Sequence, residues 1–214
     1  MEKRYGAVIF DLDGVIVFTD RYHYRAWKRL ADEEGIPFDE TINNRLRGVS
    51  RMDSLDIILE KASRVYSPQE KEALAQRKNA YYQAYLKQMK KEDVSPLTLK
   101  TLKELKRRGY RLAIGSSSKN AKFILSQVGI TSLFDAIADG NDITHSKPNP
   151  EVFLKSAFFL GKAPKDCVVM EDAFAGIEAG LAGGFDTIGI GDASHDEKST
   201  YRVGSFSDIL TLLP

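Results

Sequence analysis

The strongest constraint on the fold is an alternation of strand and helix patterns between residues 98 and 190. Short apolar runs, which predict buried strands, take turns with longer segments whose apolar residues recur at helical spacing. This alternation predicts a parallel sheet with helices on both faces. We expect helices at residues 98–108, 120–128, 150–160 and 175–182, and strands at residues 110–115, 134–138, 167–170 and 187–190.

One further strand is expected near the N-terminus, at residues 7–10, where four apolar residues lead into a polar loop. Residues 22–34 have helical spacing, and residues 39–91 show helical patterns with dense charge and no strand-like run. We therefore predict an α/β fold, a Rossmann-like parallel-sheet core with a helical cap inserted after the first strand. The expected bounds are residues 1–17 and 94–214 for the catalytic core and residues 18–93 for the cap domain.

Composition narrows the range of partners. The chain has 214 residues with 31 Lys plus Arg and 30 Asp plus Glu, a net charge of +1, which argues against a generic attraction to nucleic acid or acidic membranes. The single cysteine, Cys167, excludes an intrachain disulfide and a thiolate zinc site. No apolar run reaches the roughly 18 residues that span a bilayer. We therefore expect a cytoplasmic monomer that binds neither nucleic acid nor membranes.

Acidic residues follow two of the expected strands. Asp11 and Asp13 come directly after the first strand, and Glu171 and Asp172 come after the strand at residues 167–170. In open α/β folds, ligands bind beyond the carboxyl ends of the strands. If these two strands are neighbours, up to four carboxylates converge, and such like charges cannot all ionise cheaply. A hard divalent cation such as Mg²⁺ resolves the repulsion, whereas a role as simple turn residues does not explain the second acidic pair.

Two other features add the groups of a phosphate site. Residues 116–118 are three serines at a strand-to-helix turn, where hydroxyl and backbone donors favour an anion. Lys147 precedes two prolines, Pro148 and Pro150, which restrict the backbone on its C-terminal side. Alone, this lysine would be an ordinary surface charge. Together with the acidic strand ends, the serines and the lysine predict a phosphate-binding site around a carboxylate.

In this order, the four motifs resemble those of the haloacid dehalogenase superfamily. They are residues 10–15, the turn at Ser116, the pair Lys147-Pro148, and the pair Glu171-Asp172. The resemblance implies that Asp11 is a nucleophile that becomes an aspartyl phosphate and that Asp13 is the general acid and base. It implies that Ser116 and Lys147 complete the catalytic set. The implied Mg²⁺ ligands are Asp11, Asp13 through its main-chain carbonyl, Asp172, and Glu171 directly or through water.

Within this superfamily, the helical insert resembles the β-phosphoglucomutase branch at residues 19–28, 46–55 and 77–79. Near the cap hinge the sequence departs from the branch, because Phe18 stands where an aspartate is usual. The resemblance implies that residues 48–51 and 118–120 hold the phosphate group that is not reacting, and that His23 lies near Asp13. The implied substrate-binding residues are Thr19, His23, Trp27, Gly48, Val49, Ser50, Arg51, Lys78, Ser117, Ser118, Lys119 and Asn120.

The branch implies a phosphotransferase that interconverts β-D-glucose 1-phosphate and glucose 6-phosphate. The reaction would run through an aspartyl phosphate and glucose 1,6-bisphosphate, with Mg²⁺ as cofactor and a small sugar phosphate as the binding partner. One alternative is a Mg²⁺-dependent sugar-phosphate phosphatase with the same nucleophile. Another is a non-catalytic phosphate-binding domain, which would require the loss of an acidic residue or the lysine, and all are present. Arg51 and residues 118–120 favour the mutase, because they offer a second phosphate site.

Overall fold

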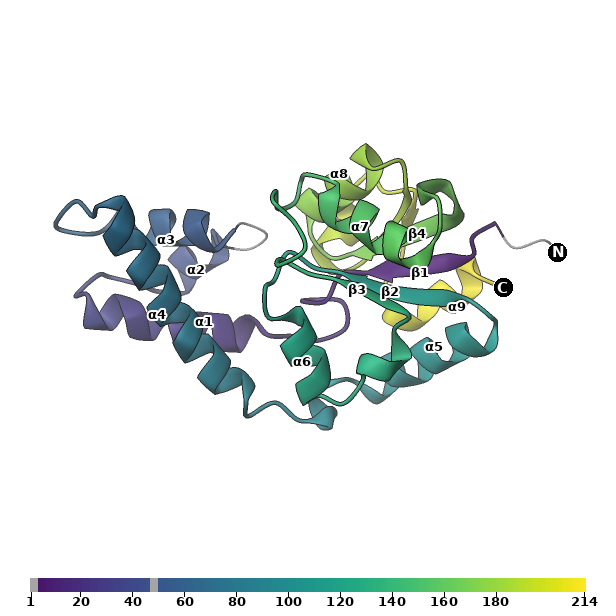
Figure 1. Cartoon of the computed structure of the whole chain (residues 1–214), viewed down its shortest axis with the longest axis horizontal. Coiled ribbons are helices and arrows are strands. Elements are labelled where there is room, and N and C mark those ends of the chain that lie inside the picture. Colours follow the sequence, from purple (N-terminus) through teal and green to yellow (C-terminus); the bar gives the residue numbers. More distant parts are fainter. Residues whose placement is uncertain (1–3, 47–49) are drawn as a thin grey trace. The chain divides into compact units, whose positions relative to one another are not determined.

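The computed structural model describes residues 4–46 and 50–214. The chain divides into two compact units, one formed by Met1–Phe18 and Lys90–Pro214 and the other by Thr19–Met89. In the described residues, the first unit holds the sheet and the second is built from helices (Figure 1). We refer to the first unit as the core and to the second as the cap.

The core contains a six-stranded sheet in the order β3-β2-β1-β4-β5-β6, and every strand pair in it is parallel. The expected α/β, Rossmann-like fold with a parallel sheet is therefore confirmed. The strands are β1 (Ala7–Phe10), β2 (Arg111–Gly115), β3 (Ala136–Ala138), β4 (Cys167–Glu171), β5 (Asp186–Gly189) and β6 (Tyr201–Arg202). The helices are α5 (Pro96–Arg107), α6 (Ala121–Gln127), α7 (Glu151–Leu160), α8 (Phe174–Ala182) and α9 (Ile209–Leu212).

Helices cover both faces of this sheet, so its central strands are buried throughout. Figure 1 shows α7 and α8 on one side of the strands and α5 and α9 on the other. On the first side, Ile9 and Val169 share an apolar cluster with Phe153 and Ala157 of α7. On the other side, the ring of Phe10 lies 5.6 Å from that of Phe206. Burial on two faces explains why β1, and β4 up to its terminal Glu171, are apolar runs without alternation.

The expected end of the sheet at residues 187–190 was wrong, because one more strand follows it. β6 has two residues and pairs with β5, with Ile188 in register with Tyr201. It is held by side chains as well: the Tyr201 hydroxyl lies 3.0 Å from that of Tyr5, and Thr200 Oγ1 accepts from the Thr187 amide at 3.0 Å. A two-residue strand is too short to give a periodic signal, so the pattern of apolar residues missed it.

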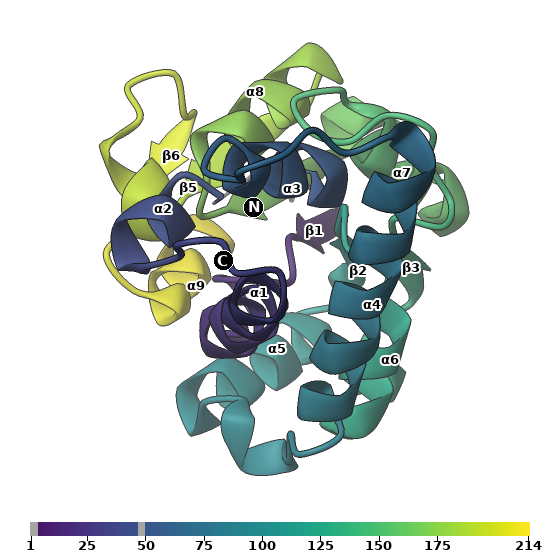
Figure 2. The same ribbon diagram turned by 90° about the vertical axis from the view of Figure 1, so that its left-hand side faces the viewer.

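The cap has its own small apolar core. Its helices are α1 (Asp20–Glu33), α2 (Glu40–Asn44), α3 (Arg51–Leu59) and α4 (Pro68–Leu86). Helix α4 packs against both α1 and α3 (Figure 2). The residues buried between them include Trp27 and Leu30 of α1, Leu55 and Ile58 of α3, and Leu74 of α4. These side chains recur at helical spacing, which is why this stretch of sequence predicted helices alone.

Local signals set where the cap helices begin. At α4, Ser67 Oγ accepts from the Glu70 amide and the Glu70 carboxylate accepts from the Ser67 amide at 2.7 Å, which is a capping box followed by Pro68. At α3, Ser50 Oγ accepts from the Asp53 amide, without the reciprocal bond of a capping box. In the part of the chain that the structure describes, no helix combines the length and apolar character needed to span a membrane.

Candidate active site

The carboxyl ends of β2, β1 and β4 lie side by side at one edge of the sheet. Phe10, the last residue of β1, is in register with Ile114 of β2 and Met170 of β4. Because the strands are parallel, the residues that follow them leave the sheet at the same edge. Asp11 and Glu171 therefore emerge together, and the condition on which the acidic site depended, that their strands are neighbours, is met.

Three carboxylates form a tight group at this edge. Asp11, Glu171 and Asp172 each offer an oxygen within 4.8 Å of the others. Asp11 is 6% exposed and Glu171 is 2% exposed, whereas Asp172 is half-buried, so the group is largely but not fully shielded from solvent. The half-buried side chain of Asp13 lies outside this group. The structure thus brings together three of the four expected acidic side chains, whereas the expected metal contact of Asp13 is through its main-chain carbonyl.

Lys147 is the cation that faces this acidic group. Its side chain is 8% exposed, and Nζ donates to a carboxylate oxygen of Asp11 and, at 2.5 Å, to Oε1 of Glu171. The ammonium also lies 4.6 Å from the centre of the Phe153 ring. A lysine held by two carboxylates inside the protein has little freedom to move. It can therefore offset charge at a fixed point beside Asp11.

The electrostatics of the site show an excess of negative charge. Burial raises the pKa of Asp11 well above its usual value, Lys147 opposes that shift, and the nearby acidic groups Glu171, Asp172 and Asp13 add to it. Burial, reinforced by Glu171, also raises the pKa of Asp172 to about 7. One lysine does not neutralise these acids. A divalent cation would lower both pKa values by supplying the missing positive charge.

Two glycines leave the space that the acidic side chains occupy. A Cβ atom on Gly14 would lie 2.0 Å from Asp172 Oδ2, and its φ of +88° also favours glycine. A Cβ atom on Gly176 would lie 1.9 Å from the carboxyl carbon of Glu171. The carboxylates are thus packed into a tight all-oxygen site, a donor set that fits Mg²⁺. Gly176 escaped the sequence analysis; its signal was a glycine inside an otherwise helical pattern.

Replacement of Gly176 by alanine is expected to displace Glu171 and, through it, Lys147. Misplacement of a catalytic group by about 1 Å can cost on the order of 10²-fold in rate, and we expect a loss of that size in kcat. The extra methyl group should also lower the midpoint of thermal unfolding, because overpacking costs about 1–3 kcal/mol.

Gly6→Ala is the matched control for this variant. Its Cβ atom would meet chiefly the mobile end of Lys162 at 3.2 Å, so rate and thermal midpoint should stay close to those of the wild type. Equal kcat values for Gly176→Ala and wild type would show that the position of Glu171 does not matter to the reaction.

The serine turn after β2 is internally hydrogen-bonded. Ser116 is 2% exposed, and its Oγ accepts from the Ser118 amide at 3.2 Å, while Ser118 Oγ accepts from the Asn120 amide at 3.3 Å. Both hydroxyl groups keep their own protons as donors. Ser117 Oγ accepts from the Lys147 amide at 3.4 Å, so the turn contacts the loop that carries the lysine. Lys119 is exposed. The expected phosphate turn and the expected catalytic lysine therefore meet.

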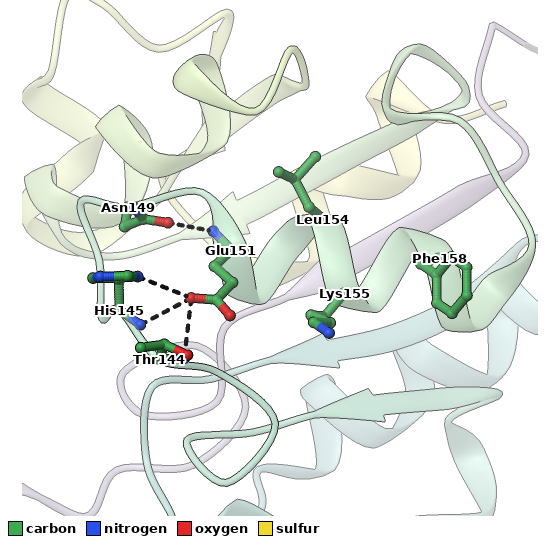
Figure 3. Close-up of a pocket in the computed structure, with 7 residues that line it drawn as sticks. All are labelled: Thr144, His145, Asn149, Glu151, Leu154, Lys155 and Phe158. Carbon is green, nitrogen blue, oxygen red and sulfur yellow. Dashed lines mark hydrogen bonds and ion pairs between the residues drawn. The ribbon is translucent and has the colours of Figure 1, made fainter.

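The loop before α7 is held by the side chain of Glu151 (Figure 3). Glu151 Oε2 accepts from the amides of Thr144 and His145 at 3.0 and 2.8 Å, and Asn149 Oδ1 accepts from the Glu151 amide at 3.0 Å. The bonds from the His145 and Thr144 amides lower the pKa of Glu151, so it stays ionised. These bonds fix the loop on both sides of Lys147. The hollow drawn in Figure 3, which continues to Leu154, Lys155 and Phe158, contains none of the expected site residues.

In the cap, His23 and Lys78 form a pair that the sequence separates by 55 positions. Lys78 is 2% exposed, and its Nζ lies 3.0 Å from His23 Nδ1 and over the rings of Trp27 and Tyr82, at 4.5 and 4.8 Å from their centres. Burial, with Lys78 and then Arg51 nearby, lowers the pKa of His23 well below its usual value. His23 is therefore neutral at pH 7. Because Nδ1 accepts from the lysine, Nε2 carries the ring proton and can donate it to a hydroxyl group.

Three of the other expected cap residues, Thr19, Ser50 and Arg51, lie at helix starts. Thr19, 1% exposed, directly precedes α1, and Arg51 opens α3, where burial lowers its pKa. The Ser50 hydroxyl donates to the Asp53 carboxylate at 2.6 Å, so it already serves the cap of α3. Trp27 is buried in the apolar core of the cap, beneath Lys78. The expected binding residues Gly48 and Val49 lie outside the described residues.

Comparison with known proteins gives the same class of fold and site. The family model of haloacid dehalogenase-like hydrolases matches residues 5–184. The chain is 42% identical to a β-phosphoglucomutase of Bacillus subtilis, over 86% of this chain and 83% of that protein. It is 32% identical to a fructose-1-phosphate phosphatase of Escherichia coli, over 89% and 98%. The crystal structure of a β-phosphoglucomutase from Clostridium difficile matches it with a TM-score of 0.87 and 39% identity, covering 96% of this chain and 93% of that one.

A buried aspartate directly after β1 pairs with a lysine from the loop between β3 and α7, and the comparisons show an enzyme of the phosphotransferase or mutase kind. Because the family match extends over most of its length, the chain belongs to the haloacid dehalogenase-like hydrolases. The resemblance to the β-phosphoglucomutase branch, expected from the motifs of core and cap, is also confirmed. The relatives include both mutases and phosphatases, so the family alone does not define the reaction.

Proposed function

We propose that this enzyme interconverts β-D-glucose 1-phosphate and glucose 6-phosphate through glucose 1,6-bisphosphate. What supports the proposal is that each unit, besides the acidic site, carries groups suited to a second phosphate. Arg51 begins the nine-residue helix α3, where helix N-terminal amides and a guanidinium both favour a phosphate. Ser118, Lys119 and Asn120 add donors from the core. A hydrolase of simple phosphate esters needs one phosphate site, whereas a mutase of a bisphosphate needs two.

Asp11 is the nucleophile in this proposal. One of its carboxylate oxygens bonds to a phosphorus atom of glucose 1,6-bisphosphate while the bond between that phosphorus and the sugar oxygen breaks, which leaves an aspartyl phosphate and a glucose monophosphate. Lys147, bonded to Asp11 and Glu171, offsets the charge that accumulates on the phosphoryl oxygens. The Ser116 hydroxyl group donates a hydrogen bond to a phosphoryl oxygen. Asp13 protonates the leaving sugar oxygen, and in the opposite direction it takes the proton from the free hydroxyl group of bound glucose 1-phosphate, so that the phosphoryl group passes from Asp11 to that hydroxyl group and forms the bisphosphate. When the bisphosphate binds in the other orientation, its other phosphoryl group passes to Asp11 and glucose 6-phosphate is released.

The acidic group is the place for Mg²⁺. Asp11, Asp172 and the main-chain carbonyl of Asp13 would hold the ion, with Glu171 beside it or linked through water. When bound, Mg²⁺ supplies positive charge next to the transferring phosphoryl group, and a carboxylate nucleophile needs that charge to approach a phosphate dianion.

The cap pair of His23 and Lys78 would bind the sugar. Neutral His23 offers its Nε2 proton to a sugar hydroxyl group, and Lys78 holds the ring in that tautomer through Nδ1. Trp27 and Tyr82 keep the ammonium of Lys78 in place by contact with their ring faces. Thr19 and Ser117 complete the proposed set of substrate contacts.

A second candidate is a phosphatase that acts on a small sugar phosphate. The observation in its favour is the 32% identity to a fructose-1-phosphate phosphatase over nearly the whole of that protein. Such an enzyme would use the same nucleophile, with water in place of the second hydroxyl group.

Product analysis separates the two candidates. The protein is incubated with β-D-glucose 1-phosphate, Mg²⁺ and a trace of glucose 1,6-bisphosphate, and glucose 6-phosphate and free phosphate are measured in the same samples. The mutase gives glucose 6-phosphate in large excess over phosphate. Phosphate release at a rate equal to substrate loss would contradict the mutase and support the phosphatase.

Arg51→Ala is expected to weaken the mutase reaction by about 2–5 kcal/mol, the cost of removing one partner of a buried charge pair. Arg51 would grip the phosphate that is not reacting, so hydrolysis of a small ester without a second phosphate should fall much less. Arg45→Ala is the control, because Arg45 is an exposed cap arginine that pairs with Glu60. An equal fall in both reactions would assign Arg51 a structural role, and no fall in either would remove the second phosphate site.

A further inference from the structure

A short loop after β3, residues 139–142, lies beside the serine turn that follows β2. The two are adjacent because β2 and β3 pair up to their last residues, with Gly115 in register with Ala138. The pairing extends one residue further, since the Ser116 amide donates to the Ala138 carbonyl at 3.1 Å. The loop contains none of the residues assigned a role above. It nevertheless contacts the part of the turn that is proposed to hold the second phosphate.

Two hydrogen bonds from the loop bind main-chain carbonyl groups of the turn. The Gly140 amide donates to the Ser118 carbonyl at 3.2 Å, and Asn141 Nδ2 donates to the Lys119 carbonyl at 3.0 Å. Each bond fixes the backbone on one side of Lys119. A lysine side chain that starts from a fixed point has fewer conformations to lose when it binds an anion.

Gly140 also sets how closely the loop and the turn approach. A Cβ atom at this position would lie 2.3 Å from the Ser117 carbonyl oxygen and 2.9 Å from the Lys119 amide nitrogen. Both neighbours are backbone atoms, so they cannot move aside as a flexible side chain would. The glycine is therefore required by close approach, because any larger residue would push the loop and the turn apart.

The loop is braced from within. Asp139 is fully buried, and its Oδ1 accepts from the Asn141 amide at 2.9 Å and from Asn141 Nδ2 at 3.0 Å. Asp142 Oδ2 accepts from the Asp139 amide and from Lys122 Nζ, both at 2.9 Å. Since Lys122 belongs to α6, the helix that follows the serine turn, its bond to Asp142 connects the loop to the C-terminal end of the turn, while the bond from the Ser116 amide to the Ala138 carbonyl connects the other end. The loop is thus a rigid support.

We propose that Gly140 and Asn141 are positioning residues that fix Ser118 and Lys119 for the second phosphate group of the substrate. The inference rests on the proposed function, in which this turn grips the phosphate that is not reacting. Asn141 acts through the main chain of Lys119, and Gly140 acts through the carbonyl groups of Ser117 and Ser118. The loop thereby contributes to specificity for a sugar bisphosphate over a donor that has only one phosphate group.

The test compares two phosphate donors with Asn141→Ala. Transfer of the phosphoryl group to the protein is followed by rapid quench, with glucose 1,6-bisphosphate or acetyl phosphate as the donor. Loss of one amide hydrogen bond should raise the half-saturating concentration of the bisphosphate about threefold to tenfold, with a smaller change in its maximal rate. For acetyl phosphate, which has no second phosphate, the half-saturating concentration should change much less. Gly140→Ala should also raise the half-saturating concentration of glucose 1,6-bisphosphate, and by a larger factor than Asn141→Ala.

Amide hydrogen exchange and two further variants complete the test. Amide hydrogen exchange at Lys119 and Asn120 should be faster in Asn141→Ala, which reports on the turn independently of activity. Ser132→Ala is the control, because Ser132 is exposed and lies before β3, at the other end of that strand. It should behave as the wild type in both assays. Lys119→Ala, measured with the same two donors, tests the role of the turn itself.

The outcomes distinguish the inference from the proposed function. Lys119→Ala could raise the half-saturating concentration of the bisphosphate alone while Asn141→Ala and Gly140→Ala leave it unchanged. In that case the loop has no positioning role and the proposed function stands. If Asn141→Ala raises the half-saturating concentrations of both donors by the same factor, its effect is structural and the inference is overturned. If Lys119→Ala does not discriminate between the donors, the turn does not bind the second phosphate, and that part of the proposed function falls together with the inference.

Discussion

Replacing Asp11 with asparagine is expected to abolish turnover, with a loss on the order of 10⁵-fold or more in kcat, as for other covalent nucleophiles. The amide has nearly the same shape, but its lone pairs are far less nucleophilic and it cannot form an acyl phosphate. Lys147 keeps a second carboxylate partner in Glu171 at 2.5 Å. The variant should therefore fold, and its midpoint of thermal unfolding should stay close to that of the wild type.

Acetyl phosphate gives the sharpest measurement of this prediction. The protein is incubated with this donor, the acyl phosphate is trapped by borohydride reduction, and the modified residue is located by peptide mass. Wild type should be modified at Asp11, and Asp11→Asn should not be modified. Asp13→Asn is the matched control: acetate is a leaving group that needs no proton, so this variant should still be labelled while its sugar turnover is slow. Near-normal turnover of Asp11→Asn would contradict the covalent reaction.

Much of the fold could be predicted from the sequence because strand and helix carry different periods. The buried strand Cys167–Glu171 is apolar up to its last residue, and the helix Pro96–Arg107 carries Leu102 and Leu105 on its buried face. The order of the strands in the sheet was not predictable in this way. No local pattern shows that β1 lies between β2 and β4, since that order depends on which faces the helices cover.

The candidate site was predictable where a residue type is rare in its setting. An aspartate at the end of an apolar strand stands out, whereas the contacts between distant residues do not. Lys147 reaches both Asp11 and Glu171, which lie 136 and 24 positions away in the chain, and nothing in the sequence specifies that pairing. The supporting positions Gly140 and Gly176 were missed for another reason. Their role depends on the atoms that a Cβ would meet, and these belong to other segments.

Some residue roles that are ambiguous in the sequence become clear from their partners. Ser50 caps a helix through Asp53, and the spacing of these two residues carries that signal. His23 gives no such signal, because its protonation depends on Lys78 on another helix of the cap. In the core, the excess of carboxylates over Lys147 follows from burial, and the sequence shows only the number of acids. That excess leads to the prediction with the second largest effect.

Removal of divalent cations by chelation is expected to abolish turnover, and added Mg²⁺ should restore it. Asp11, Glu171 and Asp172 each offer a carboxylate oxygen within 4.8 Å of the others, and Lys147 pairs with Asp11 and Glu171. Burial raises the pKa of both Asp11 and Asp172. A cation that binds the folded protein and not the unfolded chain must also stabilise it. Mg²⁺ should therefore raise the midpoint of thermal unfolding, a measurement that requires no substrate.

Asp172→Asn tests which residues hold the ion. It should weaken Mg²⁺ binding, followed by titration calorimetry, by at least the roughly 10- to 100-fold that the loss of an outer-shell partner costs. Glu178→Gln is the matched control: Glu178 lies on the same stretch of chain, in α8, but is exposed and pairs with Lys198, so binding should not change. Full turnover after thorough chelation would remove the metal from the proposal. Equal Mg²⁺ affinity of Asp172→Asn and wild type would move the ion away from this edge of the sheet, and Asp11 would then depend on Lys147 alone to meet a phosphate dianion.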